Sequence, residues 1–258
     1  MSEHVRVAIE DNILRLTLAR PEKKNALSLA MYSALANALT EAQSDPSVRA
    51  ILLDAEGDAF TAGNDLADFA AVAAGTLDRN QMTSQRFLHA LAYADKPIVA
   101  AVQGLAVGIG VTLLLHCDVV YVAEDAKLST PFVGLGLVPE AASSWLLQAR
   151  IGYARAFAMI GLGEQLDGKT AASYGLVNAA MSAAEVRPRA LAAAQHLASR
   201  AIGSLQASKR LMRDAALIEA TMDRETEVFG ARLKTAEAAE ALKAFSERRA
   251  PNFRAITG

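Results

Sequence analysis

The sequence predicts an α/β fold that is followed by a helical C-terminal region, on three observations. Short apolar strands alternate with helical segments as far as about residue 185. From Glu185 to Arg249 we find no strand pattern, only long segments rich in Ala, Leu, Arg and Glu. The chain has 258 residues, of which 52% are hydrophobic and 21% charged, a composition typical of a folded globular protein. We therefore predict an α/β core over residues 1–185 and a helical region over residues 186–258.

The first elements of the core follow from the spacing of their apolar residues. Apolar and polar residues alternate from Val5 to Ile9 and from Leu14 to Leu18, with a turn-like pair, Asp11-Asn12, between them. This period of two predicts a β-hairpin. Residues 28–43 carry apolar side chains at helical spacing and predict an amphipathic helix.

The later core elements are shorter and more apolar. Residues 50–53 predict a buried strand, which a loop containing Gly57 and Gly63 follows. Further strands are expected over Ile98–Val102 and Val119–Val122, with a buried helix from about Ile109 to His116 between them. Strands that alternate with helices in this way favour parallel pairing.

Several classes of protein are disfavoured by composition. A net charge of −2 is unlike that of a non-specific nucleic-acid binder. The longest apolar stretch, Leu105–Leu115, is too short to cross a bilayer, which takes about 20 residues. The single cysteine, Cys117, excludes an intramolecular disulfide and fits a reducing compartment, and the first residues lack the pattern of a secretory signal. We expect a cytoplasmic protein without nucleic-acid or membrane partners.

Two nucleotide-binding motifs are present only in part. Gly163–Thr170 matches the phosphate-binding pattern GxxxxGKT, but Glu164 and Asp167 would put negative charge where phosphates bind, and the preceding residues favour a helix. Gly108-Ile-Gly begins like a dinucleotide-binding fingerprint, yet Leu113 stands where the third glycine belongs. The match is interpreted as accidental in both cases. The histidines at positions 4, 89, 116 and 196 have no metal-ligand spacing, so no metal is assigned.

Two glycine-containing segments share a physical theme. Gly63 follows a predicted strand, where the backbone can turn sharply, and Gly108 directly precedes a predicted apolar helix. The first amides of a helix have no internal partner and favour negative charge. Two such amides that converge on one point would form an oxyanion hole. Close packing of helix against strand explains the glycines equally well.

Five motifs in order along the chain resemble those of the crotonase (enoyl-CoA hydratase/isomerase) superfamily. The similarity spans roughly residues 5 to 253, and each motif is weak alone, but the set in register is specific. The motifs are Arg20-Pro21 with Asn25-Ala26-Leu27, Phe60 to Leu66, Lys96-Pro97 to Gly104, Cys117-Asp118, and Gly175-Leu176-Val177.

This resemblance implies a fold, a substrate and a set of site residues. The fold would be a spiral of ββα units whose C-terminal helical region helps to form trimers, often paired into hexamers. The substrate would be an acyl-coenzyme A thioester, with no separate cofactor because coenzyme A is part of the substrate. The oxyanion amides would be those of Asn64 and Ile109. The other implied substrate-binding residues are Lys23, Lys24, Ala26, Ala62, Gly63, Asp65, Leu66, Gly108 and Phe132.

Carboxylates decide which reaction of the superfamily is expected. Hydratases carry two glutamates that activate water, and this chain has Thr112 and Phe132 at the corresponding positions. Glu140 instead follows Pro139 in an otherwise uncharged stretch, which is similar to that of monofunctional Δ3,Δ2-enoyl-CoA isomerases. We therefore predict an isomerase in which Glu140 shuttles a proton, with its pKa raised by apolar surroundings. Candidate walls are Phe132, Leu135 and Trp145, although their apolar character favours a core position for each of them.

Other interpretations of these residues stay open. Glu140 could be a solvent-facing loop residue, or a nucleophile in thioester or halide hydrolysis. Hydration by another arrangement of groups is a further possibility. A chain that only binds acyl-CoA without turning it over is the alternative outside the class of enzymes.

Overall fold

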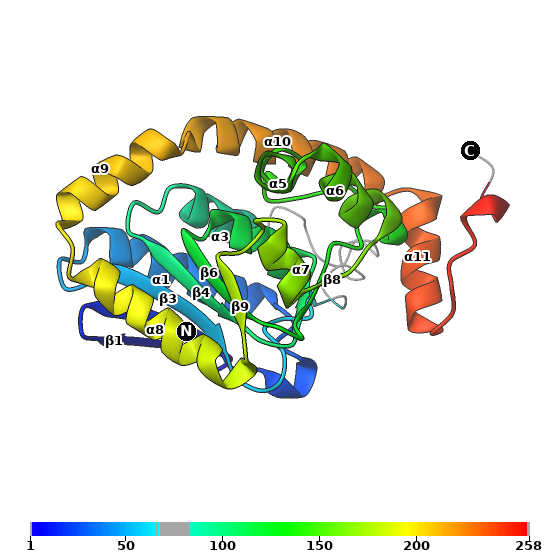
Figure 1. Ribbon diagram of the computed structural model, residues 1–258. Coiled ribbons are helices and arrows are strands. Elements are labelled where there is room, and N and C mark those ends of the chain that lie inside the picture. Colours follow the sequence, from blue (N-terminus) through cyan, green and yellow to red (C-terminus); the bar gives the residue numbers. More distant parts are fainter. Residues whose placement is uncertain (1, 66, 68–82, 257–258) are drawn as a thin grey trace.

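The computed structural model describes residues 2–65, 67 and 83–256 and has two sheets and a helical C-terminal region (Figure 1). The large sheet has six strands in the order β1-β2-β3-β4-β6-β9, and the small sheet has the order β5-β7-β8. The strands are β1 (Val5–Glu10), β2 (Ile13–Leu18), β3 (Ala50–Ala55), β4 (Ile98–Val102), β5 (Leu105–Val107), β6 (Val119–Ala123), β7 (Lys127–Ser129), β8 (Leu166–Asp167) and β9 (Ala179–Met181).

Helices connect the strands and make up the chain after β9. The α-helices are α1 (Leu29–Ser44), α3 (Ser84–Ala92), α4 (Ile109–Thr112), α5 (Ser143–Ile151), α6 (Tyr153–Phe157), α7 (Gly168–Ser173), α8 (Ala183–Ala198), α9 (Ile202–Met212), α10 (Ala215–Arg232) and α11 (Ala236–Ser246). The other helical turns are η1 (Pro21–Lys23), η3 (Leu113–His116), η4 (Val133–Leu135), η5 (Ala158–Leu162) and η6 (Phe253–Ala255).

The N-terminal hairpin forms as its sequence predicts. β1 and β2 pair antiparallel with Val5 opposite Leu18 and Glu10 opposite Ile13. Asp11 and Asn12 both have positive φ angles of 51° and 61°, the left-handed pair that a two-residue hairpin turn requires and that Asp and Asn tolerate. β2 then pairs parallel with β3, which is buried along its whole length.

Successive units of the chain place one strand in each sheet before a helix. β4 joins the large sheet, β5 the small sheet, and α4 follows; β6, β7 and α5 repeat the order. Two isolated parallel bridges, from Leu27 to Asn64 and from Thr61 to Ala106, extend the pairing of the small sheet to earlier segments of the chain. This arrangement is the expected spiral of ββα units, and the predicted α/β fold class is confirmed. The expected helix 109–116 is one α-helical turn, α4, continued as the 3₁₀ turn η3.

The C-terminal helices differ in where they pack. α8 lies against strands β3, β4 and β6 of the large sheet, while α9 and α10 arch over the core and α10 contacts α3 and α5 (Figure 1). Phe229 of α10, Leu233 directly after α10 and Ala238 of α11 form a second apolar cluster with Phe132 and Leu137. The division of the chain at residue 185 stays a prediction about domain organisation.

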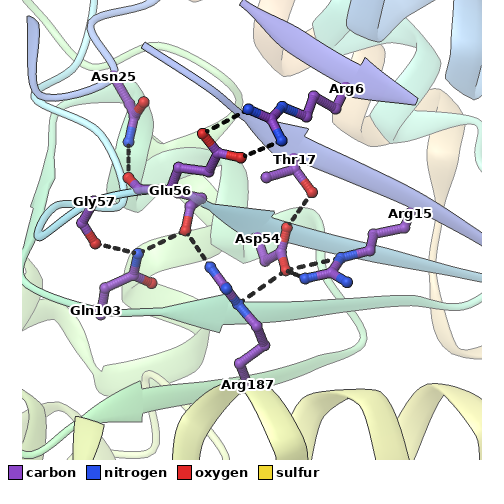
Figure 2. A network of polar contacts seen from close by, with 10 residues as sticks. Arg6, Arg15, Thr17, Asn25, Asp54, Glu56, Gly57, Gln103 and Arg187 are labelled. Atoms are coloured by element: carbon purple, nitrogen blue, oxygen red, sulfur yellow. Dashed lines mark hydrogen bonds and ion pairs between the residues drawn. The ribbon is translucent and has the colours of Figure 1, made fainter. Parts of the chain in front are cut away.

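A buried carboxylate ties α8 to the sheet. Asp54, near the end of β3, is fully buried and accepts hydrogen bonds from Thr17 at 2.6 Å and from Arg15 at 2.6 Å, both on β2 (Figure 2). Arg187 of α8 forms an ion pair with the same carboxylate at 3.2 Å. A buried charge needs such partners, because an unpaired one costs several kcal/mol, of the order of 3–5. The contacts anchor the strand that leads into the loop before Thr61.

Candidate active site

Asn64 and Ile109 occupy equivalent places in successive turns of the spiral. Asn64 follows the small-sheet segment at Thr61, and Ile109 follows β5, the strand that bridges to Thr61. In the bridge to Asn64, both hydrogen bonds are made by Leu27: its N–H donates to Gly63 O and its carbonyl accepts from the N–H of Asp65. The N–H of Asn64 therefore points away from Leu27, and within residues 2–65, 67 and 83–256 it has no acceptor.

Ile109 offers the second free amide. It begins α4 after Gly108, whose φ is 55°, and the N–H groups of Val111 and Thr112 donate to Gly108 O. The N–H of Ile109 precedes these bonds, as the first amides of a helix do, and no acceptor for it exists in the described part of the chain. Its side chain is buried, so the backbone alone can contact a ligand.

Gly63 and Gly110 allow the two amide-bearing segments to pack closely against each other. A Cβ atom at Gly63, where φ is 96°, would lie 2.9 Å from Val107 O, and one at Gly110 would lie 2.6 Å from Thr61 Cγ2. Thr61 is fixed in turn, because its hydroxyl donates to Asn25 O at 2.7 Å and accepts from the N–H of Gly63 at 3.1 Å. Close packing and an oxyanion hole are thus compatible uses of the same glycines.

Glu140 lies beside Asn64, although the two are far apart in the sequence. Asn64 Nδ2 donates a long hydrogen bond of 3.5 Å to Glu140 Oε1, and the hydroxyl of Tyr32 on α1 donates to Asn64 Oδ1. Glu140 is half-buried. Burial and the nearby Glu225 carboxylate raise the pKa of Glu140 to about 7, against the opposing effect of the Asn64 hydrogen bond. A carboxyl group with this pKa can take and return a proton near neutral pH.

The predicted coenzyme A segments lie next to each other. The N–H of Ala62 donates to Lys24 O at 2.8 Å, which joins residues 23–26 to residues 62–65. Arg20 donates to Ala26 O at 3.1 Å and to Asp65 at 2.8 Å. Burial raises the pKa of Asp65, but Arg20, the N–H of Ala67 and the charge of Lys23 together outweigh burial and hold that pKa below its usual range.

The remaining predicted substrate-binding residues divide into three cases. Lys23 and Lys24 are exposed, and Lys24 pairs with Asp58 at 2.6 Å. Leu66 lies outside the residues that the structure describes. Phe132 is buried in the apolar cluster with Phe229 of α10 and Leu233, the residue after that helix.

The two other candidate walls also have packing partners. Leu135 packs against the cluster of Phe132, and Trp145 packs partly buried against the main core. Their contact with a substrate stays a prediction.

The residues at the two hydratase positions cannot activate water as carboxylates do, and the residues of the phosphate-loop match are engaged in other contacts. Thr112 is fully buried and, like Phe132, has no carboxylate. In the phosphate-loop match, Asp167 caps α7 by accepting from the N–H of Thr170 at 2.7 Å, and Lys169 pairs with Glu124 at 2.9 Å. These contacts occupy the groups that phosphates would need. Among the described residues, no group of three or more His, Cys, Asp or Glu could hold a metal ion.

Three residues that lie near the site were not identified as site residues from the sequence. Tyr32 looks like an ordinary apolar position of α1, and Asn25 looks like one residue of a motif. Asn25 is buried, and its amide donates to Glu56 O and Ala59 O, both at 2.8 Å, at the entrance to the Thr61 segment. Glu225 is one of several glutamates on α10. Only its distant partners, Ala142 and Ser144, distinguish it.

Comparison with known proteins agrees with this architecture. The sequence matches the family described as Enoyl-CoA hydratase/isomerase over residues 8–255. The chain belongs to the enoyl-CoA hydratase/isomerase family. It is 32% identical to the 1,2-epoxyphenylacetyl-CoA isomerase of Escherichia coli K12, over 98% of this chain and 99% of that protein. It is also 32% identical to a probable enoyl-CoA hydratase of Bacillus subtilis 168, over 97% and 98%.

A solved structure of the enoyl-CoA hydratase/isomerase family has the same fold. The enoyl-CoA hydratase/isomerase of Pseudoalteromonas atlantica T6c superposes with a TM-score of 0.91, at 42% identity over 97% of this chain and all of that one. Members of this family act on acyl-CoA thioesters, so the chain is an enzyme of that class. Because relatives at similar identity carry isomerase and hydratase names, the particular reaction has to be argued from the site.

Of the residues that the structure describes, no helix combines the length and the apolar character that a membrane span needs.

Proposed function

We propose that the protein is a Δ3,Δ2-enoyl-CoA isomerase that uses Glu140 as a single proton shuttle. The observation that carries the proposal is Glu140 itself: a half-buried carboxyl beside Asn64 with a pKa of about 7. The ionised carboxylate would take a proton from C2 of a 3-enoyl thioester. The resulting carboxylic acid would return that proton to C4, which leaves the double bond at C2.

The free amides of Asn64 and Ile109 would stabilise the intermediate. Removal of the C2 proton gives a dienolate whose charge lies largely on the thioester oxygen. Donors that are already in place for this oxygen lower the barrier without reorganisation. The exposed lysines 23 and 24 and the backbone of residues 62–65 would bind the coenzyme A part, so no further cofactor is needed.

Hydration is the second reaction to consider, because Glu225 is a second carboxylate near Glu140. Its Oε2 accepts from the N–H of Ala142 at 2.6 Å and its Oε1 from the N–H of Ser144 at 2.8 Å. Both oxygens are therefore engaged with backbone, which supports isomerisation over activation of a water molecule. A cytoplasmic location, and a homotrimer or a dimer of trimers, belong to the same proposal.

A panel of 3-enoyl-CoA and 2-enoyl-CoA thioesters tests this proposal. Isomerisation of a 3-enoyl-CoA leaves the mass unchanged while the absorbance of the conjugated thioester appears. Hydration adds the mass of one water, and hydrolysis releases free coenzyme A or halide. If none of the thioesters reacts but coenzyme A esters still raise the melting temperature, the protein is a binder and the proposal is wrong.

A further inference from the structure

The segment that carries Glu140 has a strained backbone. Ala141 and Ala142, the two residues after Glu140, have φ angles of 61° and 57°. This left-handed conformation costs a non-glycine residue about 1–2 kcal/mol, so two in succession persist only where other contacts hold them. The turn leads directly into α5, and the Ser143 hydroxyl donates to Glu140 O at 2.6 Å.

Glu225 holds this turn from another part of the molecule. It lies on α10 and is 7% exposed, and its two carboxylate oxygens accept from the N–H groups of Ala142 and Ser144. These are amides at the start of α5, which have no partner within the helix and favour an anion. Both oxygens are needed, since each accepts one bond. Within the same turn, Ala141 O is contacted by His116 at 2.8 Å.

We propose that Glu225 is a positioning residue of the reaction, which holds the Glu140–Ala142 turn so that the Glu140 carboxyl faces Asn64. The inference rests on the proposed function of Glu140, and it assigns to α10 a part in catalysis. Glu225 itself need not contact the substrate. It acts through the conformation of the turn and through its charge.

The charge of Glu225 has an effect on the pKa of Glu140 that a purely structural residue would not have. Glu225 and Asn64 are the groups that act on the Glu140 carboxyl from the described elements. The Glu225 carboxyl is acted on by Ser144, the N–H of Ala142, and Arg224 of α10. Burial raises the pKa of Glu225, and the bonds from Ser144 and Ala142 oppose that effect. A carboxylate at this place raises the pKa of Glu140, so removal of its charge should lower that pKa.

The test is Glu225→Gln, with Glu227→Gln as its matched control. Gln has nearly the same shape but no charge, and its NH2 group, which replaces one carboxylate oxygen, cannot accept from a backbone N–H. Glu227 is an exposed glutamate of the same helix. For a 3-enoyl-CoA substrate we expect kcat of Glu225→Gln to fall about tenfold or more, while KM changes less than about threefold. The acidic limb of kcat/KM should move to lower pH by about one unit.

Infrared difference spectra supply a readout that needs no turnover. The protonated carboxyl band that Glu140→Gln removes can be titrated in the wild type and in Glu225→Gln, and its midpoint should fall in the variant. A protein that isomerises nothing would contradict the proposed function, yet this titration would still test Glu225. An unchanged kcat and an unchanged midpoint overturn the inference. So does a lowered kcat with an unchanged midpoint and a lower melting temperature, since Glu225 would then be merely structural.

Discussion

Glu140 is the residue on which the proposed chemistry depends. Glu140→Gln keeps the size of the side chain but removes the base, so kcat for 3-enoyl-CoA isomerisation should fall by about 10²–10⁴. The affinity for a saturated acyl-CoA, measured by calorimetry, should stay close to that of the wild type. Glu140→Asp should keep part of the activity, because the base remains but is one methylene further from C2 and C4.

A matched control for Glu140 is Thr112→Ala, which alters a buried residue at a hydratase position and should cost far less activity. If Glu140→Gln retains more than about a tenth of the wild-type turnover, which is far above what loss of a positioned base allows, Glu140 is not the shuttle.

The pH dependence of the reaction should follow the same carboxyl group. The pKa of Glu140 is raised to about 7, and only the ionised form can take the C2 proton. The value of kcat/KM should therefore rise with pH and reach half its maximum near pH 7, because it reports groups of the free enzyme. Initial rates from pH 5 to 9 measure this limb. Half-maximal activity near pH 4.5, the usual value for a glutamate, would contradict the assignment.

His116 should affect stability rather than the chemical step. It is fully buried, its Nδ1 faces Arg213 and its Nε2 faces Ala141 O. Burial, with Arg213, lowers its pKa from 6.5 to about 3. The unfolded chain then binds more protons between these values, so the free energy of unfolding should fall as the pH drops from about 6.5 toward 3.

Urea unfolding at several pH values measures this dependence. In His116→Gln, which keeps an N–H donor for Ala141 O, the slope below pH 6.5 should be shallower. His196→Gln, at an exposed histidine of α8, should leave the slope unchanged. Equal slopes in the wild type and in His116→Gln would show that His116 is not the group responsible.

At the scale of elements, the contact between α4 and the Thr61 segment would set the geometry of the proposed oxyanion hole. Gly110→Ala would place a Cβ atom 2.6 Å from Thr61 Cγ2 and 3.2 Å from Thr61 O. Thr61 cannot rotate away without losing its bonds to Asn25 and Gly63. We expect the two segments to separate, with a fall in kcat of about tenfold or more and a lower melting temperature.

Gly203→Ala is the control for Gly110→Ala. Gly203 lies in α9, and no heavy atom lies within 4 Å of its added Cβ, so alanine should leave activity unchanged and stabilise the helix slightly. Equal kinetics in the two variants would show that the packing of α4 against Thr61 does not position the amides.

At the scale of the whole molecule, the C-terminal helices expose large apolar side chains. Leu211 and Met212 at the end of α9 are 89% and 87% exposed, and Leu217 follows on α10. Side chains of this kind are typical of an interface between subunits. Light scattering after gel filtration should give three or six times the 27.2 kDa of one chain, and the double variant Leu211→Asp, Met212→Asp should give smaller species.

The control for this double variant is Val7→Asp. Val7 is 52% exposed on the edge strand β1, so its substitution should leave an assembly formed through α9 unchanged. A wild-type protein with the mass of one chain would contradict the prediction of an oligomer.

The sequence by itself determined the parts of this protein that depend on local pattern. The hairpin over residues 5–18, the helix from residue 29 and the strand Ile98–Val102 follow from hydrophobic period and turn residues. The family follows from five different motifs that occur in order along the chain. Glu140 was recognisable because it is a single charge in an uncharged stretch that matches a known motif.

Only the tertiary structure decided which distant groups act on that carboxyl. Tyr32 and Glu225 lie in helices whose sequence periods mark them as ordinary positions, and the bond from Ala142 to Glu225 spans 83 residues. The left-handed turn at Ala141 and Ala142 carries no glycine that would predict it. A sequence pattern indicates the period of one element and which of its faces is buried. The pKa of a side chain and the conformation of a strained turn depend instead on which groups of other elements lie in contact with them.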